Sequence, residues 1–457
     1  MNKLPLPEDV TFILQKLEEY GYESYIVGGC VRDAILSKFP HDYDICTSAL
    51  PEEIISCFDG FKTILTGMKY GTVTVVINNE KYEITTYRID GSYSDGRRPD
   101  EVKYTKDIVE DLSRRDFTMN AIAYNPNSGF VDPFYGVNDI KNRIIRCVNN
   151  PYDRFSEDTL RILRAWRFSL QLGFDIDADT LYAAYYELHN LSNVSEERIF
   201  SELCKALQAN FQEKLYHPGS LPFIVAIFPE WKKTIKFWQN NPWHIFDVST
   251  HSLFAYTHLD YENTDLITKL ATLLHDIGKP ESYQVDRCGV KHFFGHAEVG
   301  AEMVNEILKR LRADNSTREA VVELVKYHDY NIINTKKSVR KLLNKLGERQ
   351  TRRLIQLKIA DNLAQNPKMV KYRIDQLKEI PSIIDEIIAD NECFKLSDLT
   401  IKGKDIIDLG VPEGKWIGFF LNQCLDSVIE GQVENDKESL LDLSRKLIES
   451  MKEMHTI

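Results

Sequence analysis

Two aspartates separated by a single residue, Asp42 and Asp44, form the first pattern in the chain that suggests catalysis. Side chains at positions i and i+2 of a β-strand lie on the same face, so both carboxylates can bind the same pair of metal ions. Ligation by oxygen alone suits Mg²⁺, which also binds phosphate oxygens. Two such ions can activate an attacking hydroxyl and stabilise a leaving pyrophosphate. The pair therefore predicts a catalytic Mg²⁺ site for nucleotidyl transfer.

Residues just upstream add a phosphate-binding pattern. Gly28 and Gly29 follow an expected strand and precede an expected helix, where glycine lets backbone N–H groups approach phosphate oxygens. Arg32 lies in the first helical turn and can hold a phosphate through a forked hydrogen bond. An isolated Asp-x-Asp is more often a solvated loop or a helix cap. The order Gly-Gly, Arg and Asp-x-Asp within one short segment favours a nucleotide site.

Hydrophobic patterning predicts the elements that must position these residues. Strand patterns are concentrated in the first 150 residues, and a helical spacing replaces them after about residue 155. The fold class is therefore predicted as α+β, with an N-terminal mixed sheet and flanking helices followed by an all-helical remainder. The expected strands are 24–29, 42–47 and an antiparallel hairpin formed by 70–77 and 82–89.

Proline-rich stretches at 212–243 and 367–381 are expected breaks in this organisation. The predicted domains are a nucleotidyltransferase head, a helical neck and body that hold the nucleotide template, a metal-dependent phosphohydrolase domain and a helical tail. Their expected boundaries are 1–145, 146–240, 241–365 and 366–457.

Five motifs in the first 230 residues occur in an order found in one enzyme family. They are GGCVRD (28–33) with DYDICT (42–47), RRDFTMNAIAY (114–124), DPFYGVNDI (132–140), EDTLRILR (157–164) and EERIFSEL (196–203). This set resembles the class II tRNA nucleotidyltransferases, the CCA-adding enzymes of bacteria, whose head is polymerase-β-like. The third motif departs from the family pattern, because Tyr135 stands where the first glycine of Asp-Pro-Phe-Gly-Gly is expected.

The resemblance implies a site for CTP and ATP. In it, Asp42 and Asp44 are catalytic and hold Mg²⁺, and Asp116 contacts the ribose 2′-hydroxyl. The nucleotide-binding residues that it implies are Gly28, Gly29, Arg32, Arg115, Asp116, Asn120, Asp158, Arg161, Arg164 and Arg167.

Base selection is assigned by the same resemblance to Asp158 and Arg161. Cytosine and adenine both present an amino donor beside a ring-nitrogen acceptor, and an aspartate beside an arginine presents the complement. Uracil mismatches both groups, and each buried polar group left unpaired costs about 1–3 kcal/mol. On spacing alone, an ion-pair-rich helix start is the favoured interpretation of the two residues.

A second ordered set lies further along the chain. THSLFAYTHLDY (250–261), LLHDIGKP (273–280), GHAEVGAEM (295–303), KYHDY (326–330) and KIADN (358–362) resemble the HD phosphohydrolase superfamily. The resemblance implies a divalent transition metal such as Mn²⁺, Ni²⁺ or Fe²⁺ on His251, His275, Asp276 and Asp361. His296 and His328 stand at spacings found in members that bind a second metal. Lys279 is either a phosphate ligand or part of a helix cap.

The overall charge argues against nucleic-acid binding, but basic residues cluster. The chain of 457 residues has 57 basic and 69 acidic residues, a net charge of −12. Binding responds to local potential, and residues 336–358 hold nine Lys or Arg and one Glu. A second basic cluster spans 141–167. Each is predicted as either an RNA-binding face or a solvated helix face.

The remaining composition describes an ordinary globular protein of a reducing compartment. The eight cysteines form no Cys-x-x-Cys pair, so reduced thiols are expected. Neither a signal peptide nor a membrane span is recognisable, and a cytoplasmic protein without a membrane or an obligate protein partner is predicted.

The predicted activity is addition of CCA to the 3′ end of tRNA from CTP and ATP, with release of pyrophosphate and with an additional HD phosphohydrolase activity. The string Asp95-Gly96-Arg97-Arg98-Pro99, in an expected mobile loop, favours full CCA addition. The alternatives are an A-adding or CC-adding specialist, a poly(A) polymerase, a phosphohydrolase with an inactive head and a non-catalytic RNA-binding module.

Overall fold

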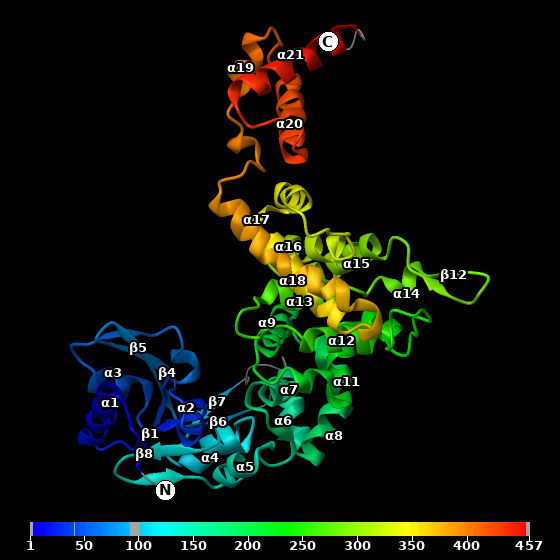
Figure 1. The fold of residues 1–457 in the computed structure, drawn as a ribbon. Coiled ribbons are helices and arrows are strands. Elements are labelled where there is room, and N and C mark those ends of the chain that lie inside the picture. Colours follow the sequence, from blue (N-terminus) through cyan, green and yellow to red (C-terminus); the bar gives the residue numbers. More distant parts are fainter. Residues whose placement is uncertain (1–2, 41, 92–100, 454–457) are drawn as a thin grey trace. The chain divides into compact units, whose positions relative to one another are not determined.

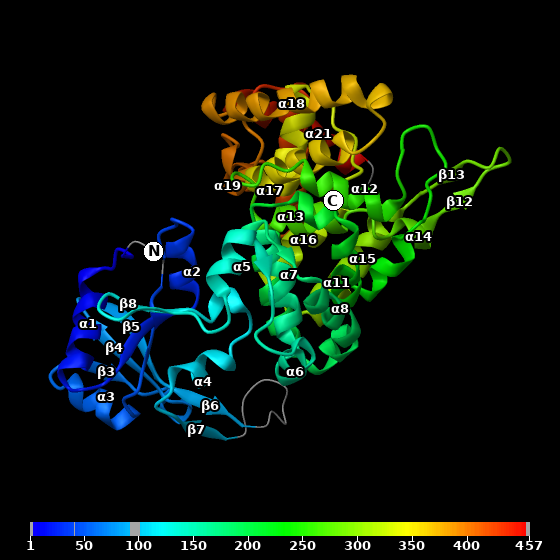
Figure 2. The same ribbon diagram turned by 90° about the horizontal axis from the view of Figure 1, so that it is seen from below.

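The computed structural model describes residues 3–40, 42–91 and 101–453. The chain forms two compact units, Met1–Pro229 and Glu230–Ile457, and Figures 1 and 2 show each from two directions. The division falls within the proline-rich stretch 212–243, where a break is predicted. The string from Asp95 to Pro99 lies outside the described residues.

The first unit is built on a seven-stranded mixed sheet, drawn in blue and cyan in Figure 1. Among the described strands of this sheet, β2 and β5 are parallel neighbours and every other pair is antiparallel. This arrangement confirms the predicted fold class. In spatial order the strands are β3 (Lys62–Ile64), β4 (Thr72–Ile77), β5 (Glu80–Thr86), β2 (Asp44–Thr47), β1 (Ser24–Val27), β8 (Ala123–Asn125) and β9 (Gly129–Val131).

The predicted hairpin is formed by β4 and β5. Asn78 and Asn79 connect the strands, and both adopt positive φ angles, 50° and 68°. Asparagine tolerates this conformation better than most residues, and a two-residue turn of this kind matches the twist of the strands. Val73, Val75 and Ile77 alternate into the core, so every second residue of β4 is buried.

Helices surround the sheet and continue into the neck. The head contains α1 (Glu8–Glu19), α2 (Gly29–Ile35), α3 (Pro51–Cys57), α4 (Ile108–Ser113) and α5 (Gly136–Asn142), with the small hairpin β6 (Arg88–Asp90) and β7 (Val102–Tyr104). The helical part comprises α6 (Pro151–Glu157), α7 (Leu160–Leu172), α8 (Ala178–Glu187), α9 (Glu196–Leu207), α10 (Glu213–Tyr216) and α11 (Leu221–Ile227). β10 (Ile144–Ile145) pairs in parallel with β11 (Asp175–Ile176) and so ties these helices to the head.

The departure at Tyr135 coincides with a backbone conformation that favours glycine. Tyr135 has φ 60° and caps α5, and its side chain is exposed. The glycine that follows is held much more tightly, since a Cβ on Gly136 would lie 2.1 Å from the Thr118 carbonyl oxygen. Asp132 accepts hydrogen bonds from the backbone N–H groups of Gly136 and Val137 at 2.7 and 2.9 Å.

Replacing Gly136 by alanine should therefore destabilise the first unit by about 1–3 kcal/mol, the usual cost of overpacking. Denaturant unfolding measures the change. Tyr135→Gly is the matched comparison. This substitution relieves the strain of a left-handed backbone conformation, which stabilises the fold by about 1 kcal/mol. It also makes the unfolded chain more flexible, which destabilises the fold by about the same amount, so the free energy of unfolding should hardly change. An equal loss of unfolding free energy in both variants would contradict the clash at Gly136.

The second unit is helical. Its first part comprises α12 (Val248–Thr257), α13 (Leu266–Leu274), α14 (Lys279–Ser282), α15 (His296–Arg310), α16 (Asn315–Tyr327), α17 (Lys336–Leu363) and α18 (Pro367–Ala389). A hairpin of β12 (Gln284–Val285) and β13 (Lys291–His292) projects from these helices in both views. The expected break at 367–381 is wrong, because α18 begins at Pro367 and continues through Pro381.

A separate hydrophobic cluster forms the C-terminal end. It comprises buried residues between Cys393 and Ile448, carried mainly by α19 (Gly403–Asp408), α20 (Lys415–Glu430) and α21 (Lys437–Glu453). α18 packs instead along α17. No helix in the described part of the chain is long and apolar enough to cross a bilayer.

The basic run 336–358 is largely paired within its own unit, and an RNA-binding role for it stays a prediction. Its cations pair with acidic residues of the same unit, such as Lys341 with Glu430 at 2.7 Å and the buried Arg353 with Asp265 at 2.5 Å. The other pairs are Lys336 and Arg340 with Glu392, Arg349 with Asp265, and Arg352 with Glu348 and Asp385. Internal pairing therefore neutralises much of the charge that suggested RNA binding.

Candidate active sites

The head carboxylates lie at the start of β2. Asp44 is the first residue of the strand and Asp42 precedes it, so the expectation that both belong to the strand is wrong for Asp42. Both side chains are exposed. Desolvation raises the pKa of Asp44, and the neighbouring Asp42 raises it further, whereas Arg115 opposes the shift. A divalent cation bound by both carboxylates would favour their charged forms.

The glycine turn lies beside these carboxylates, because β1 and β2 are antiparallel neighbours. Gly28 has φ 84° and precedes α2, and a Cβ at this position would lie 3.1 Å from the Arg115 guanidinium. The turn thus needs glycine both for its backbone conformation and for the close approach of an arginine. This geometry agrees with the predicted phosphate-binding role of the turn.

Three predicted nucleotide-binding residues and Asp116 form one hydrogen-bonded chain. Arg32 donates to Asn120 at 2.8 Å, and Asn120 donates to Asp116 at 3.0 Å. Arg164 donates to the other oxygen of Asp116 at 2.6 and 3.0 Å. Burial alone would raise the pKa of Asp116, but Arg164 outweighs it and lowers the pKa to about 2. The chain holds Asp116 ionised between two segments that are distant in sequence.

The expected template pair spans a break between two helices rather than opening one helix. Asp158 lies between α6 and α7 in an extended conformation, and Arg161 lies in the first turn of α7. Their partners also differ. Asp158 pairs with Arg198 at 2.9 Å, whereas Arg161 pairs with Glu157 at 2.6 Å. The two are therefore positioned independently and form no ion pair with each other in the described structure.

Phe168 and its neighbours are functional candidates that sequence reasoning missed. The guanidinium groups of Arg32, Arg164 and Arg167 lie 5.1, 5.5 and 4.1 Å from the centre of the Phe168 ring. Arg167 is buried and pairs with Glu202 at 2.6 Å, and its role in nucleotide binding stays a prediction. The i, i+4 spacing of Arg164 and Phe168 was a usable signal, and Arg198 and Glu202 lie within the fifth motif.

In the second unit, the six predicted HD residues converge from five segments. All lie at or near helix ends except His251, which lies within α12. The pair His275-Asp276 follows α13, His296 begins α15, His328 ends α16 and Asp361 lies in the last turn of α17. The four histidines and Asp276 are buried. The structure thus brings together every residue expected at this site.

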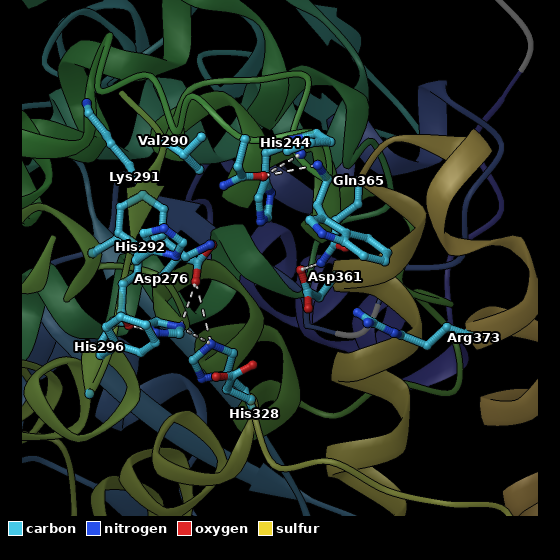
Figure 3. A pocket seen from close by; sticks show the side chains of 18 residues that line it. His244, Asp276, Val290, Lys291, His292, His296, His328, Asp361, Gln365 and Arg373 are labelled. Carbon is cyan, nitrogen blue, oxygen red and sulfur yellow. Dashed lines mark hydrogen bonds and ion pairs between the residues drawn. The ribbon is translucent and has the colours of Figure 1, made fainter. Parts of the chain in front are cut away.

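Asp276 lies between two groups of nitrogen ligands. Its Oδ2 is 3.4 and 3.3 Å from the Nε2 atoms of His251 and His275. Its Oδ1 is 3.6 and 3.5 Å from those of His296 and His328, as Figure 3 shows. Each group is compact enough to hold a metal ion. Asp361 completes the first group, with Oδ1 3.0 Å from His251.

Backbone carbonyls orient all four imidazoles in the same way. The Nδ1 atoms lie 3.3, 2.8, 2.7 and 2.6 Å from the carbonyl oxygens of residues 364, 272, 293 and 325. A carbonyl only accepts, so Nδ1 must donate. If both rings are neutral, each Nε2 atom then carries a lone pair, and the two Nε2 atoms of His296 and His328 lie only 3.1 Å apart. Two facing lone pairs repel each other, and a cation bound between them and the nearby carboxylate would remove this repulsion.

The charges of the site also attract positive charge. Burial disfavours protonation of His275, but Asp276 and Asp361 outweigh it and raise the pKa to about 10. Burial lowers the pKa of His296 to about 4, and the charge of His328 adds to the shift. The two carboxylates thus favour positive charge on His275, whereas burial and the charge of His328 disfavour protonation of His296.

A pocket of about 610 Å³ opens onto this centre. Lys279 donates to Asp276 at 2.6 Å and to Gln239 at 2.8 Å, so its ammonium group lies at the centre. Gln365 donates to Asp361 at 3.0 Å. Sequence reasoning missed both glutamines. Gln365 follows Asp361 by four residues on the same helix, which was a usable signal, whereas nothing in the sequence pointed to Gln239.

The chain matches three described families. Residues 24–146 match the poly A polymerase head domain, residues 173–217 match the probable RNA- and SrmB-binding site of polymerase A, and residues 292–443 match the putative domain 2 of tRNA nucleotidyltransferase.

Relatives cover nearly the whole chain. The CCA-adding enzyme of Staphylococcus epidermidis is 33% identical over 431 residues, 94% of this chain and 95% of the relative. That of Enterococcus faecalis is 31% identical over 437 residues, 95% and 94% of the two chains. A crystal structure of the Bacillus stearothermophilus CCA-adding enzyme in complex with CTP has a TM-score of 0.72 at 27% identity and covers 98% of both chains. The Thermotoga maritima enzyme complexed with tRNA, at 19% identity and a TM-score of 0.62 over 97% and 96% of the chains, shares the fold.

The mixed sheet, the carboxylates at the start of its middle strand β2 and the helices that follow define a nucleotidyltransferase that acts on tRNA. The full-length similarity to relatives above 30% identity makes the assignment more specific. The chain belongs to the family of CCA-adding enzymes.

Proposed function

We propose that the head transfers two CMP units and then one AMP unit to the 3′ hydroxyl of tRNA and releases pyrophosphate. The observation that carries this proposal is the pair Asp42 and Asp44 beside the Gly28 turn, in a chain with full-length CCA-adding relatives. The solved relatives include complexes with CTP, with ATP and with tRNA. tRNA, CTP and ATP are accordingly the proposed substrates.

Each residue of the head site has a task in this proposal. Asp42 and Asp44 hold Mg²⁺, which when bound supplies positive charge to the transferring phosphate and the leaving pyrophosphate. The N–H groups that follow Gly28 face the phosphates. Arg32, held by Asn120, offers its forked donors to a phosphate in exchange for its contact with Asp33. Asp116, kept ionised by Arg164, accepts from the ribose 2′-hydroxyl.

The direct test uses purified protein, tRNA that lacks its 3′ end, CTP, ATP and Mg²⁺, with sequencing of the products. Complete CCA ends support the proposal. Ends that stop after CC, ends that gain only A, or long A tails would identify the CC-adding, A-adding or poly(A) alternatives.

Arg161→Ala should relax base choice before it abolishes transfer. In the proposal, Arg161 donates to the ring nitrogen of cytosine or adenine, and its loss removes the mismatch with uracil. Discrimination against UTP should therefore fall about tenfold, the effect of one unpaired buried group. The measurement is kcat/KM for CTP, ATP and UTP. Lys141→Ala, an exposed cation of α5, is the control. Unchanged discrimination would leave Arg161 as a structural partner of Glu157.

For the second unit we propose a metal-dependent HD phosphohydrolase that hydrolyses phosphate esters. The facing Nε2 atoms of His296 and His328 and the two-sided contacts of Asp276 support a pair of divalent ions. Mn²⁺, Ni²⁺ and Fe²⁺ are the candidate metals, because mixed imidazole and carboxylate ligands suit them. When bound, such ions lower the pKa of a water molecule.

The predicted domain boundaries remain proposals, with one refinement. The proposed phosphohydrolase domain, 241–365, would include α18 as well, because this helix packs along α17, which carries Asp361. A cytoplasmic location likewise remains a proposal.

A further inference from the structure

The pocket above the HD centre has cations that metal ligation does not use. Lys279, Lys291, His292 and Arg373 all line it. The volume, about 610 Å³, lies within the range of small-molecule sites. Which of these cations is available to a substrate depends on the partners that each already has.

Three of these four side chains already have hydrogen-bond or ion-pair partners. Lys279 donates to Asp276 and Gln239. Lys291 donates to the Trp238 carbonyl at 2.7 Å, and its ammonium lies 4.1 Å from the centre of the Phe237 ring. His292 pairs with Asp286 at 2.9 Å. None of these groups is free to meet an incoming anion without giving up a contact.

Arg373 differs from the other three. It makes no hydrogen bond or ion pair with any residue of the described segments, and its guanidinium lies 4.9 Å from the centre of the Trp243 ring. Figure 3 shows its side chain reaching from α18 towards the pocket on the side of Asp361. A guanidinium that stacks on an indole keeps its N–H donors available at its edge.

The platform under Arg373 is held in place by the backbone. The N–H of Trp243 donates to the side chain of Asn241 at 3.0 Å, and the Trp243 carbonyl accepts from the Asn366 N–H at 2.8 Å. Asn366 also donates to the Pro242 carbonyl at 3.0 Å and caps α18. The tryptophan and the helix that carries Arg373 are thus tied to each other, and the stacked pair is pre-organised.

We propose that Arg373 binds the phosphate group of the substrate at the HD centre and that Trp243 positions it. The inference rests on the proposed phosphohydrolase function and names a further binding residue for it. The fixed fork of a guanidinium matches two phosphate oxygens. The ligand class is a phosphate ester whose anion faces Arg373.

Arg373→Gln tests the assignment in the full-length protein loaded with Mn²⁺. The KM for p-nitrophenyl phosphate and the Kd for inorganic phosphate by calorimetry should both rise about tenfold, the effect of one lost charged hydrogen bond. The kcat and the metal content should stay within about twofold, because the metal ligands are unchanged. Lys371→Gln, an exposed cation of the same helix outside the pocket, should change neither constant.

Trp243 variants test the positioning role. Trp243→Ala should raise the same two constants, and Trp243→Phe should restore most of the loss because it keeps an aromatic platform. Unchanged KM and Kd in Arg373→Gln would overturn the inference, as would a loss of metal content, which would show a structural role. Absence of hydrolysis by the wild type would instead refute the proposed function, and phosphate binding would still decide the role of Arg373.

Discussion

Asp44→Asn should reduce CCA addition at least about 10³-fold, because a metal-held transition state is stabilised by several kcal/mol. Asp44 begins β2, and Asp42, the other proposed ligand, precedes it by two residues. The amide keeps the size of the side chain but loses the negative charge that holds Mg²⁺. Incorporation of labelled CMP and AMP into tRNA that lacks its 3′ end measures the effect, and Asp42→Asn should behave alike.

The Asp44→Asn substitution should reduce nucleotide addition without destabilising the fold. Asp59→Asn, an exposed aspartate of the head without a proposed role, should retain normal addition. The thermal unfolding of Asp44→Asn should stay near that of the wild type, because the exposed carboxylate makes no ion pair in the described structure. Activity of more than a few per cent in both carboxylate variants would refute the metal assignment.

Asp276→Asn should abolish the proposed phosphohydrolase and leave CCA addition near normal. This carboxylate touches both groups of histidines, so its neutralisation removes a ligand from each metal position. Bound Mn²⁺ should fall from two ions per chain towards zero, and hydrolysis of p-nitrophenyl phosphate should fall at least about 100-fold. Metal analysis and the two activity assays measure these outcomes.

A second variant separates ligation from folding. His296→Gln changes only the second group and should leave one ion bound. In the wild type, added Mn²⁺ should raise the melting temperature, because an ion that binds only the folded state stabilises it. Asp375→Asn, an exposed aspartate of α18, is the control. Simultaneous loss of CCA addition and hydrolysis in Asp276→Asn would contradict two independent sites, and full metal content would contradict the ligand set.

Local patterns in the sequence were sufficient to predict the elements that carry the candidate site residues. The strand pattern predicted the hairpin of β4 and β5, and the motif order predicted the family. The order of histidines and aspartates in the second unit was also sufficient to name six residues that the structure brings together, and their HD activity stays a prediction. Their convergence on Asp276 depends on how these helices pack on one another, which the order of the residues does not specify.

Only the tertiary structure decided which partner each charged side chain has. Asp158 and Arg161 are close in sequence, yet they pair with Arg198 and Glu157. The basic run 336–358 is bound largely by acids that lie elsewhere in the chain, such as Asp265 and Glu430. Electrostatic energy depends on distance in space and on burial, and neither can be read from spacing along the chain. For the same reason, a side chain such as Arg373, on an ordinary amphipathic helix, lines the same pocket as Asp361 only because α18 packs against α17.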